Sequence, residues 1–125
     1  MDTQRRVWLA ASAILVMGLV PADAGQPLTI TVRPKVALAP AYLQVRTIIE
    51  ADPDNRSLEI VAESADFYSS SQVQLDGARA PRVATFLFRA LPTGVYEVTG
   101  TLFGTDGRRA TTSQTVNVGT PPDAR

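Results

Sequence analysis

Alternation of apolar and polar residues is the feature that most constrains how this chain can fold. Leu43, Val45, Thr47 and Ile49 alternate with Tyr42, Gln44, Arg46 and Ile48, and a period of two recurs after Gly25, where no sustained helical period is found. Alternation places every second side chain on one face of a strand. We expect seven strands: Leu28–Val32, Tyr42–Ile49, Leu58–Glu63, Ser71–Leu75, Val83–Phe88, Val95–Phe103 and Thr111–Val118.

Short strands at this spacing, without a long helix, predict an all-β, two-layer antiparallel β-sandwich of about seven strands. Pro34 interrupts the first strand, which is therefore expected at a sheet edge and resumes, if at all, at Val36. Asp76-Gly77 and Asp106-Gly107 are expected to form turns in which the glycine takes a positive φ.

The first 24 residues are expected to be a cleaved signal peptide that precedes the fold. Arg5 and Arg6 are followed by an uncharged run of 14 residues, Val7–Val20, and Ala22-Asp23-Ala24 offers the small residues that a signal peptidase recognises. A membrane-spanning helix needs about 20 apolar residues, so this run is too short to remain as an anchor. We predict a signal-peptide helix over 1–24, cleavage between Ala24 and Gly25, a secreted or periplasmic location and no membrane span after cleavage.

The rest of the chain is expected to form one domain, 25–118, followed by a disordered tail over 119–125. It contains no His and no Cys, so it lacks the commonest general base, the commonest metal ligands and disulfide bonds. The formal net charge is zero, which argues against nucleic acid as a partner, because nucleic-acid-binding surfaces are basic. We expect no enzyme activity and no cofactor.

Charge is unevenly distributed along the sequence. Ala41–Asp76 holds two Arg and seven acids, whereas Gly77–Thr115 holds five Arg and two acids. This asymmetry indicates either an acidic and a basic face or a difference that disappears when the strands interleave in space. We favour the second interpretation.

The segment Leu91–Val98, LPTGVYEV, is similar to a cell-wall sorting signal, but it lacks the third residue of that signal and no hydrophobic tail follows it. It is better explained as a corner between two strands. Leu91 ends one strand connection, Gly94 turns the chain, and Tyr96 lies early in the next strand. This arrangement resembles the corner of immunoglobulin-like and fibronectin type III-like sandwiches, which implies that Tyr96 buries its ring and returns its hydroxyl group to the backbone near the preceding turn. Such a bond is needed there because an unpaired buried polar group costs about 1–3 kcal/mol.

The corner and its surroundings resemble bacterial immunoglobulin-like or fibronectin type III-like β-sandwich domains, mainly over residues 83–118. The matching pattern is Phe86-x-Phe88, Leu91-Pro92-x-Gly94-x-Tyr96, Asp106-Gly107 and Thr115-Val116-x-Val118. The resemblance implies a structural role for Leu91, Gly94 and Tyr96. The sequence after the leader contains neither a Cys pair nor a Trp, so an antibody-type domain is not expected, whereas a transthyretin-like topology stays open.

Two groups of residues are candidates for binding. Asp52, Asp54 and Asn55 offer oxygen ligands for Ca²⁺, but they match no calcium-loop consensus and are common turn formers, so we expect no metal there. Tyr42, Tyr68 and Phe103 are out of phase with the buried positions and form a candidate contact surface, on which a sugar ring could stack.

The function predicted from these observations is contact with other proteins. The edge strands expected at Leu28–Val32 and Thr111–Val118 could pair with an extended peptide. We therefore predict an exported, non-enzymatic module that mediates protein–protein contacts in the cell envelope, with an envelope or extracellular protein as partner. The alternative is a carbohydrate-binding module with a polysaccharide ligand.

Overall fold

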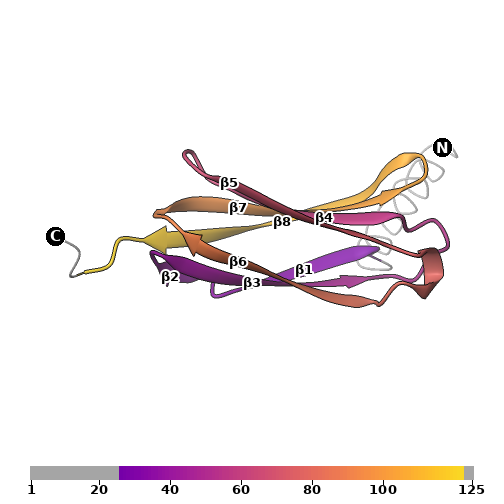
Figure 1. The fold of residues 1–125 in the computed structure, drawn as a ribbon, viewed down its shortest axis with the longest axis horizontal. Coiled ribbons are helices and arrows are strands. Elements are labelled where there is room, and N and C mark those ends of the chain that lie inside the picture. Colours follow the sequence, from indigo (N-terminus) through magenta and orange to yellow (C-terminus); the bar gives the residue numbers. More distant parts are fainter. Residues whose placement is uncertain (1–25, 123–125) are drawn as a thin grey trace, which may run out of the picture.

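The computed structural model describes residues 26–122, which form two β-sheets packed face to face (Figure 1). The predicted signal peptide, its cleavage site between Ala24 and Gly25, and residues 123–125 of the predicted tail lie outside the described residues. Within the described range, no helix has the length and apolar character needed to cross a membrane. The prediction of an all-β sandwich is confirmed.

The described residues contain eight strands and one 3₁₀ helix: β1 Leu28–Arg33, β2 Val36–Leu38, β3 Ala41–Ile49, β4 Ser57–Glu63, β5 Tyr68–Gln74, η1 Gly77–Arg79, β6 Val83–Leu91, β7 Gly94–Gly104 and β8 Gly107–Gly119. The eighth strand is β2, the continuation of the first predicted strand beyond Pro34. One sheet has the order β1-β3-β6 and the other β2-β8-β7-β4-β5. All neighbouring strands are antiparallel except β2 and β8, which are parallel.

The core lies between the sheets and uses every second residue of the strands. In β3, alternate residues from Ala41 to Ile49 are buried and the residues between them are exposed, which confirms the predicted alternation. Burying one large aliphatic side chain contributes about 1.5–3 kcal/mol, and the chain has no Cys for a disulfide bond. The largest side chains buried from the five-stranded sheet are Leu58, Ile60, Tyr96, Val98, Leu102 and Val116.

One lateral side of the sandwich, formed by β1, β2 and β8 and here called the closed side, is sealed by contacts between the sheets. The chain leaves the three-stranded sheet at Pro34 and joins the other sheet as β2, which pairs with Asn117–Gly119 of β8. The rest of β8 lies against β1, where the Gln114 side-chain amide donates to the carbonyl of Ile30 (3.3 Å). The two edge strands predicted from the sequence therefore cover one another.

The opposite lateral side, here called the open side, is formed by β5 and β6. They are the outermost strands of the two sheets on this side, and neither has a further neighbour among the described strands. β5 extends beyond the sheet that faces it, because even its inward-pointing residues Ser71 and Val73 are exposed.

Gln26 and Pro122, the first and last described residues, lie at opposite ends of the long axis (Figure 1). The turns follow the sequence prediction at Gly77 and Gly107, where φ is +54° and +111°. At the corner between β6 and β7, however, Ala90 takes the positive φ (56°) rather than Gly94.

Candidate functional site

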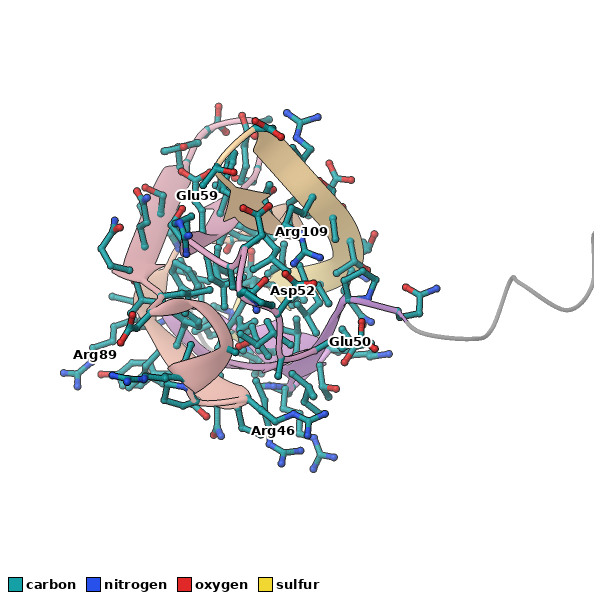
Figure 2. All side chains as sticks on the ribbon, turned by 90° about the vertical axis from the view of Figure 1, so that its right-hand side faces the viewer. Arg46, Glu50, Asp52, Glu59, Arg89 and Arg109 are labelled. Carbon is teal, nitrogen blue, oxygen red and sulfur yellow. The ribbon has the colours of Figure 1, made fainter. Side chains whose placement is uncertain are left out.

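The outer face of the three-stranded sheet carries positive charge. Arg33 of β1, Arg46 of β3 and Arg89 of β6 all occupy exposed positions on it. Figure 2 shows Arg46 and Arg89 pointing away from this sheet, whereas Glu59 lies on the other sheet, near the top of the view. The side chains between them include exposed apolar groups: Tyr42 (60 %), Ile48 (40 %), Val83 (43 %) and Leu87 (52 %). We call this surface the basic face.

A groove of about 300 Å³ lies on the basic face, lined by Thr31, Arg33, Gln44 and Arg46. The strand register explains its composition, since Thr31 lies opposite Arg46 and Arg33 lies opposite Gln44. The two guanidinium groups are therefore diagonal neighbours, with a hydroxyl and an amide group completing the square. Guanidinium groups bind carboxylates and phosphates through paired hydrogen bonds, so the groove suits an anionic group.

Among residues 26–122, the arginines of the basic face have no carboxylate partner. β1, β3 and β6 contain no Asp or Glu, and no carboxylate of residues 26–122 forms an ion pair with Arg33, Arg46 or Arg89. A pair of arginines without an acid gives the fold no evident benefit, which favours a role in binding.

The outer face of the five-stranded sheet carries acidic groups on β4 and β7, and the basic residues of this sheet, Arg108 and Arg109, lie at the start of β8. Glu59 and Glu63 of β4 and Glu97 of β7 point outward, and β4, β5 and β7 contain no basic residue. The acidic and basic parts of the sequence thus interleave in space, as the favoured interpretation expects, but an uneven distribution of charge between the two sheets remains. The division follows the sheets rather than the sequence, because Arg46 comes from the acidic part of the chain and Glu97 from the basic part.

Asp52, Asp54 and Asn55, the residues considered for calcium, are bound by the side chain of Arg109 from β8. Arg109 donates to the Asn55 side-chain oxygen and to Asp52 Oδ2 (3.1 Å), and its Nε lies 3.9 Å from Asp54 Oδ2. Figure 2 shows Arg109 and Asp52 side by side near the centre of the view. A guanidinium group thus takes the place that a cation would need, and within residues 26–122 no group of three or more acidic side chains is placed to hold a metal ion.

The other hydrogen bonds of the β3–β4 loop, which contains Asp52, Asp54 and Asn55, give this loop a structural role. Asn55 is fully buried, and its amide nitrogen donates to the carbonyl of Glu50 (2.9 Å). Asp54 accepts hydrogen bonds from the hydroxyl (2.7 Å) and the backbone N–H (3.1 Å) of Thr105. The Thr105 hydroxyl bond is the main cause that lowers the pKa of Asp54 below its usual value, with the Thr105 N–H and Arg109 adding to it. The β3–β4 loop is therefore tied to the β7–β8 hairpin.

The corner residues Leu91, Gly94 and Tyr96 lie together at the β6–β7 connection. Tyr96 is fully buried and its hydroxyl donates to the carbonyl of Pro92 (2.7 Å). Its ring packs edge-on against Phe67, with 6.2 Å between the ring centres. Leu91 is also fully buried, and a Cβ at Gly94 would lie 3.2 Å from the side chain of Ser64. Close packing, not a positive φ, explains the glycine.

The aromatic residues Tyr42, Tyr68 and Phe103 do not form one surface. Tyr42 lies on the outer face of the three-stranded sheet, whereas Tyr68 and Phe103 belong to the other sheet. Tyr68 pairs with Glu63 at one end of β4, and Phe103 pairs with Ser57 at the other end, about 20 Å away at 3.3 Å per residue. Only Tyr42 lies on the basic face.

Comparisons with known proteins give a fold but no family. No protein-family model matches the sequence, and no curated protein matches it. A solved superoxide reductase (neelaredoxin) from Ignicoccus hospitalis is 16% identical, with 82% of this chain and 89% of that chain covered and a TM-score of 0.57. A transglutaminase from red sea bream is 20% identical, with 82% and 16% covered and a TM-score of 0.56.

A third similar structure is a family 76 glycoside hydrolase from a bovine Bacteroides thetaiotaomicron strain, which is 19% identical, with 75% of this chain and 20% of that chain covered and a TM-score of 0.53. At these identities the likeness shows the β-sandwich alone. Three proteins with different names share this fold, so fold cannot assign an activity.

The residues of the basic face were not predicted from the sequence, although some of them can be recognised there. Gln44 and Arg46 occupy the outward positions of a strand that was correctly predicted. Arg33 and Arg89 come from other strands, and their place on the same face as Arg46 depends on the order β1-β3-β6, which alternation alone does not specify.

Proposed function

We propose that this chain is an exported, non-enzymatic β-sandwich module of the immunoglobulin-like or fibronectin type III-like type, which binds an acidic protein partner in the cell envelope through the basic face. The observation that carries this proposal is the set of arginines, Arg33, Arg46 and Arg89, which form no ion pair with any carboxylate of the part of the chain that the structure describes. The exposed apolar groups around them supply area that binding can remove from water, and interfaces are enriched in Arg and Tyr.

Three further features support the proposal. The buried Tyr96, with its hydroxyl on the Pro92 carbonyl, is typical of immunoglobulin-like sandwiches. The N-terminal leader pattern supports export to the periplasm or the exterior. The sequence has no His, the commonest general base, and Arg109 engages Asp52 and Asp54, which supports a binding role.

A matched pair of variants tests the proposal. The chain is purified after export, its N-terminus is sequenced to check cleavage before Gly25, and it is used as bait for envelope proteins. Arg33→Gln with Arg46→Gln should lose the partner, with affinity reduced at least tenfold. Glu59→Gln with Glu63→Gln, which changes the same number of charges on the other sheet, should keep it. Equal capture by both variants would refute binding through the basic face.

A polysaccharide is the second candidate ligand, favoured by one observation: the exposed ring of Tyr42 lies on the same face of β3 as the groove residues Gln44 and Arg46. Such a ligand would have to be acidic, because the groove is lined by two guanidinium groups. Affinity electrophoresis against a polyuronate and a neutral glucan tests whether the chain binds an acidic polysaccharide. Retardation by the polyuronate alone, lost in Tyr42→Ala, would favour carbohydrate over protein.

A further inference from the structure

The open side of the sandwich offers unused main-chain hydrogen-bonding groups on β5. The bonds from Leu75 N to Arg56 O and from Ser64 N to Phe67 O frame the β4–β5 ladder. In an antiparallel ladder, hydrogen-bonded residues alternate with residues whose N–H and C=O point away from the partner. The odd-numbered residues of β5 therefore bond β4, and the N–H and C=O groups of Tyr68, Ser70, Gln72 and Gln74 point outward.

The same reasoning applies to β6. The bond from Ile49 N to Arg82 O sets the alternation of the β3–β6 ladder, so the main-chain groups of Val83, Thr85 and Leu87 point outward. In both strands the residues with free main-chain groups are also those whose side chains lie on the outer face of their sheet. The two edges can therefore pair with each other without placing a side chain on the wrong face.

β5 lacks the usual protection of an edge strand. Natural edges carry charges, Pro or bulges that prevent pairing with another chain, whereas the seven residues of β5, YSSSQVQ, contain no charge and no Pro and pair with β4 without a register shift. The closed side differs, because the Ile30 carbonyl on its edge accepts from Gln114 and β2 covers the end of β8.

Charges flanking the two open edges are complementary. Asp66 and Asp76 lie just outside the two ends of β5, whereas Arg82 and Arg89 lie at or beside the two ends of β6. All four are exposed, and neither ion pair found within residues 26–122 includes them. Pairing of β5 with a second β5 would bring acids together, while pairing of β5 with β6 brings each acid near an arginine.

We infer that the open side is an interface between two copies of this chain, in which β5 of each copy pairs antiparallel with β6 of the other. β5 and β6 run in opposite directions along the long axis (Figure 1). A twofold axis parallel to the strands keeps these directions and exchanges the two sheets. It therefore forms both junctions at once and closes the dimer.

The alternation of outward-pointing groups restricts each junction to registers in which these residues face one another, and the flanking charges favour one of them. Gln74, Gln72 and Ser70 of one copy face Val83, Thr85 and Leu87 of the other. Three pairs that each exchange two bonds make about six main-chain hydrogen bonds per junction. On the inner side, Val73, now 38 % exposed, comes to lie beside the Ala84 of the second copy. The overhanging strands of the two copies then face each other, and each covers the uncovered inner side of the other.

Disulfide trapping tests this register cleanly, because the natural chain has no Cys. In the exported chain, Ser70→Cys with Leu87→Cys should yield covalent dimers on mild oxidation, since residues in a hydrogen-bonded pair have Cα atoms about 5.5 Å apart, a distance that suits a disulfide. Ser70→Cys with Gln72→Cys is the matched control for pairing of β5 with β5. Dimers formed only by the control pair, or by neither pair, overturn the inference.

Sedimentation of the natural chain supplies the second measurement. It should show a monomer–dimer equilibrium that Gln72→Pro abolishes and Gln72→Ala preserves. The N–H of Gln72 points away from β4, so proline there removes only a bond to the second copy and leaves the melting temperature of the monomer near that of the alanine variant. A natural chain that stays monomeric at millimolar concentration contradicts the inference. The groove residues Arg33 and Arg46 of the basic face lie on β1 and β3, away from the β6 edge, so the proposed partner binding would then be decided by its own test.

Discussion

At the end of the sandwich where β6 turns into β7, a neutral side-chain hydrogen bond holds the corner. At the other end, charged and polar side chains join two segments, the β3–β4 loop and the β7–β8 hairpin. The first bond joins Tyr96 to Pro92, four residues earlier, and lies at a fully buried ring. The second set joins Asp52, Asp54 and Asn55 to Thr105 and Arg109, more than 50 residues away.

The comparison shows how the stability of each end depends on pH and salt. The Tyr96 bond involves no ionised group, so neither pH nor salt within the ordinary range should affect it. The ion pairs of Arg109 lie in partly exposed positions, with 24 % of the Arg109 side chain and 37 % of the Asp52 side chain accessible, so water and ions weaken them. Mutation, acid and salt should therefore act differently at the two ends.

The largest effect is expected from Tyr96→Phe. Removing the hydroxyl leaves the Pro92 carbonyl without its donor and should lower the free energy of unfolding by about 1–3 kcal/mol. Urea unfolding at pH 7 and at pH 5 should give the same loss, because no charge is involved. Tyr42→Phe, at an exposed position, serves as the control and should be neutral.

Asn55→Ala, at the charged end, is expected to lower the free energy of unfolding by less than Tyr96→Phe does. It removes the bonds to the Glu50 carbonyl and to Arg109, but Glu50 is exposed and water can replace its donor. We expect a loss of about 1 kcal/mol, measured by urea unfolding. A loss as large as that of Tyr96→Phe would mean that the two ends are equally sealed from water.

Acid should weaken the charged end alone. The pKa of Asp54 is lowered in the folded state, chiefly by the Thr105 hydroxyl, so the unfolded chain takes up its proton at a higher pH than the folded chain does. The contribution of Asp54 is complete above the unfolded pKa, about 3.9, and is lost as pH falls through the lower folded value. Comparison of wild type with Asp54→Asn across pH 2–5 should show a difference that shrinks with acid; a constant difference would contradict this origin.

Salt should have the smallest effect. Raising NaCl from 0.05 M to 1 M screens the Arg109 ion pairs and should cost about 0.2–1 kcal/mol. Arg109→Gln should remove this dependence, whereas Tyr96→Phe should show the same slope as wild type. If the free energy of unfolding depends on salt concentration equally in wild type and Arg109→Gln, the salt dependence comes from other charges.

The two ends also show what sequence reasoning can and cannot reach. Leu91, Gly94 and Tyr96 lie within six residues, so the corner could be predicted from their spacing in the sequence. The core positions could likewise be predicted from the alternation within single strands. Arg109 and Asp52 meet only because β7 lies beside both β4 and β8. The basic face depends on strand order in the same way, and the open side depends on which edges the chain leaves uncovered.

The parallel pairing of β2 with β8 has a mechanical consequence. Gln26 and Pro122 lie at opposite ends of the molecule (Figure 1), so tension applied to both would slide β2 along β8. The bonds from Ala39 N to Gly119 O and from Asn117 N to Lys35 O would then bear the force together instead of opening in turn. Resistance to stretching, which the rate of forced unfolding measures, would be concentrated in a strand of three residues between two prolines.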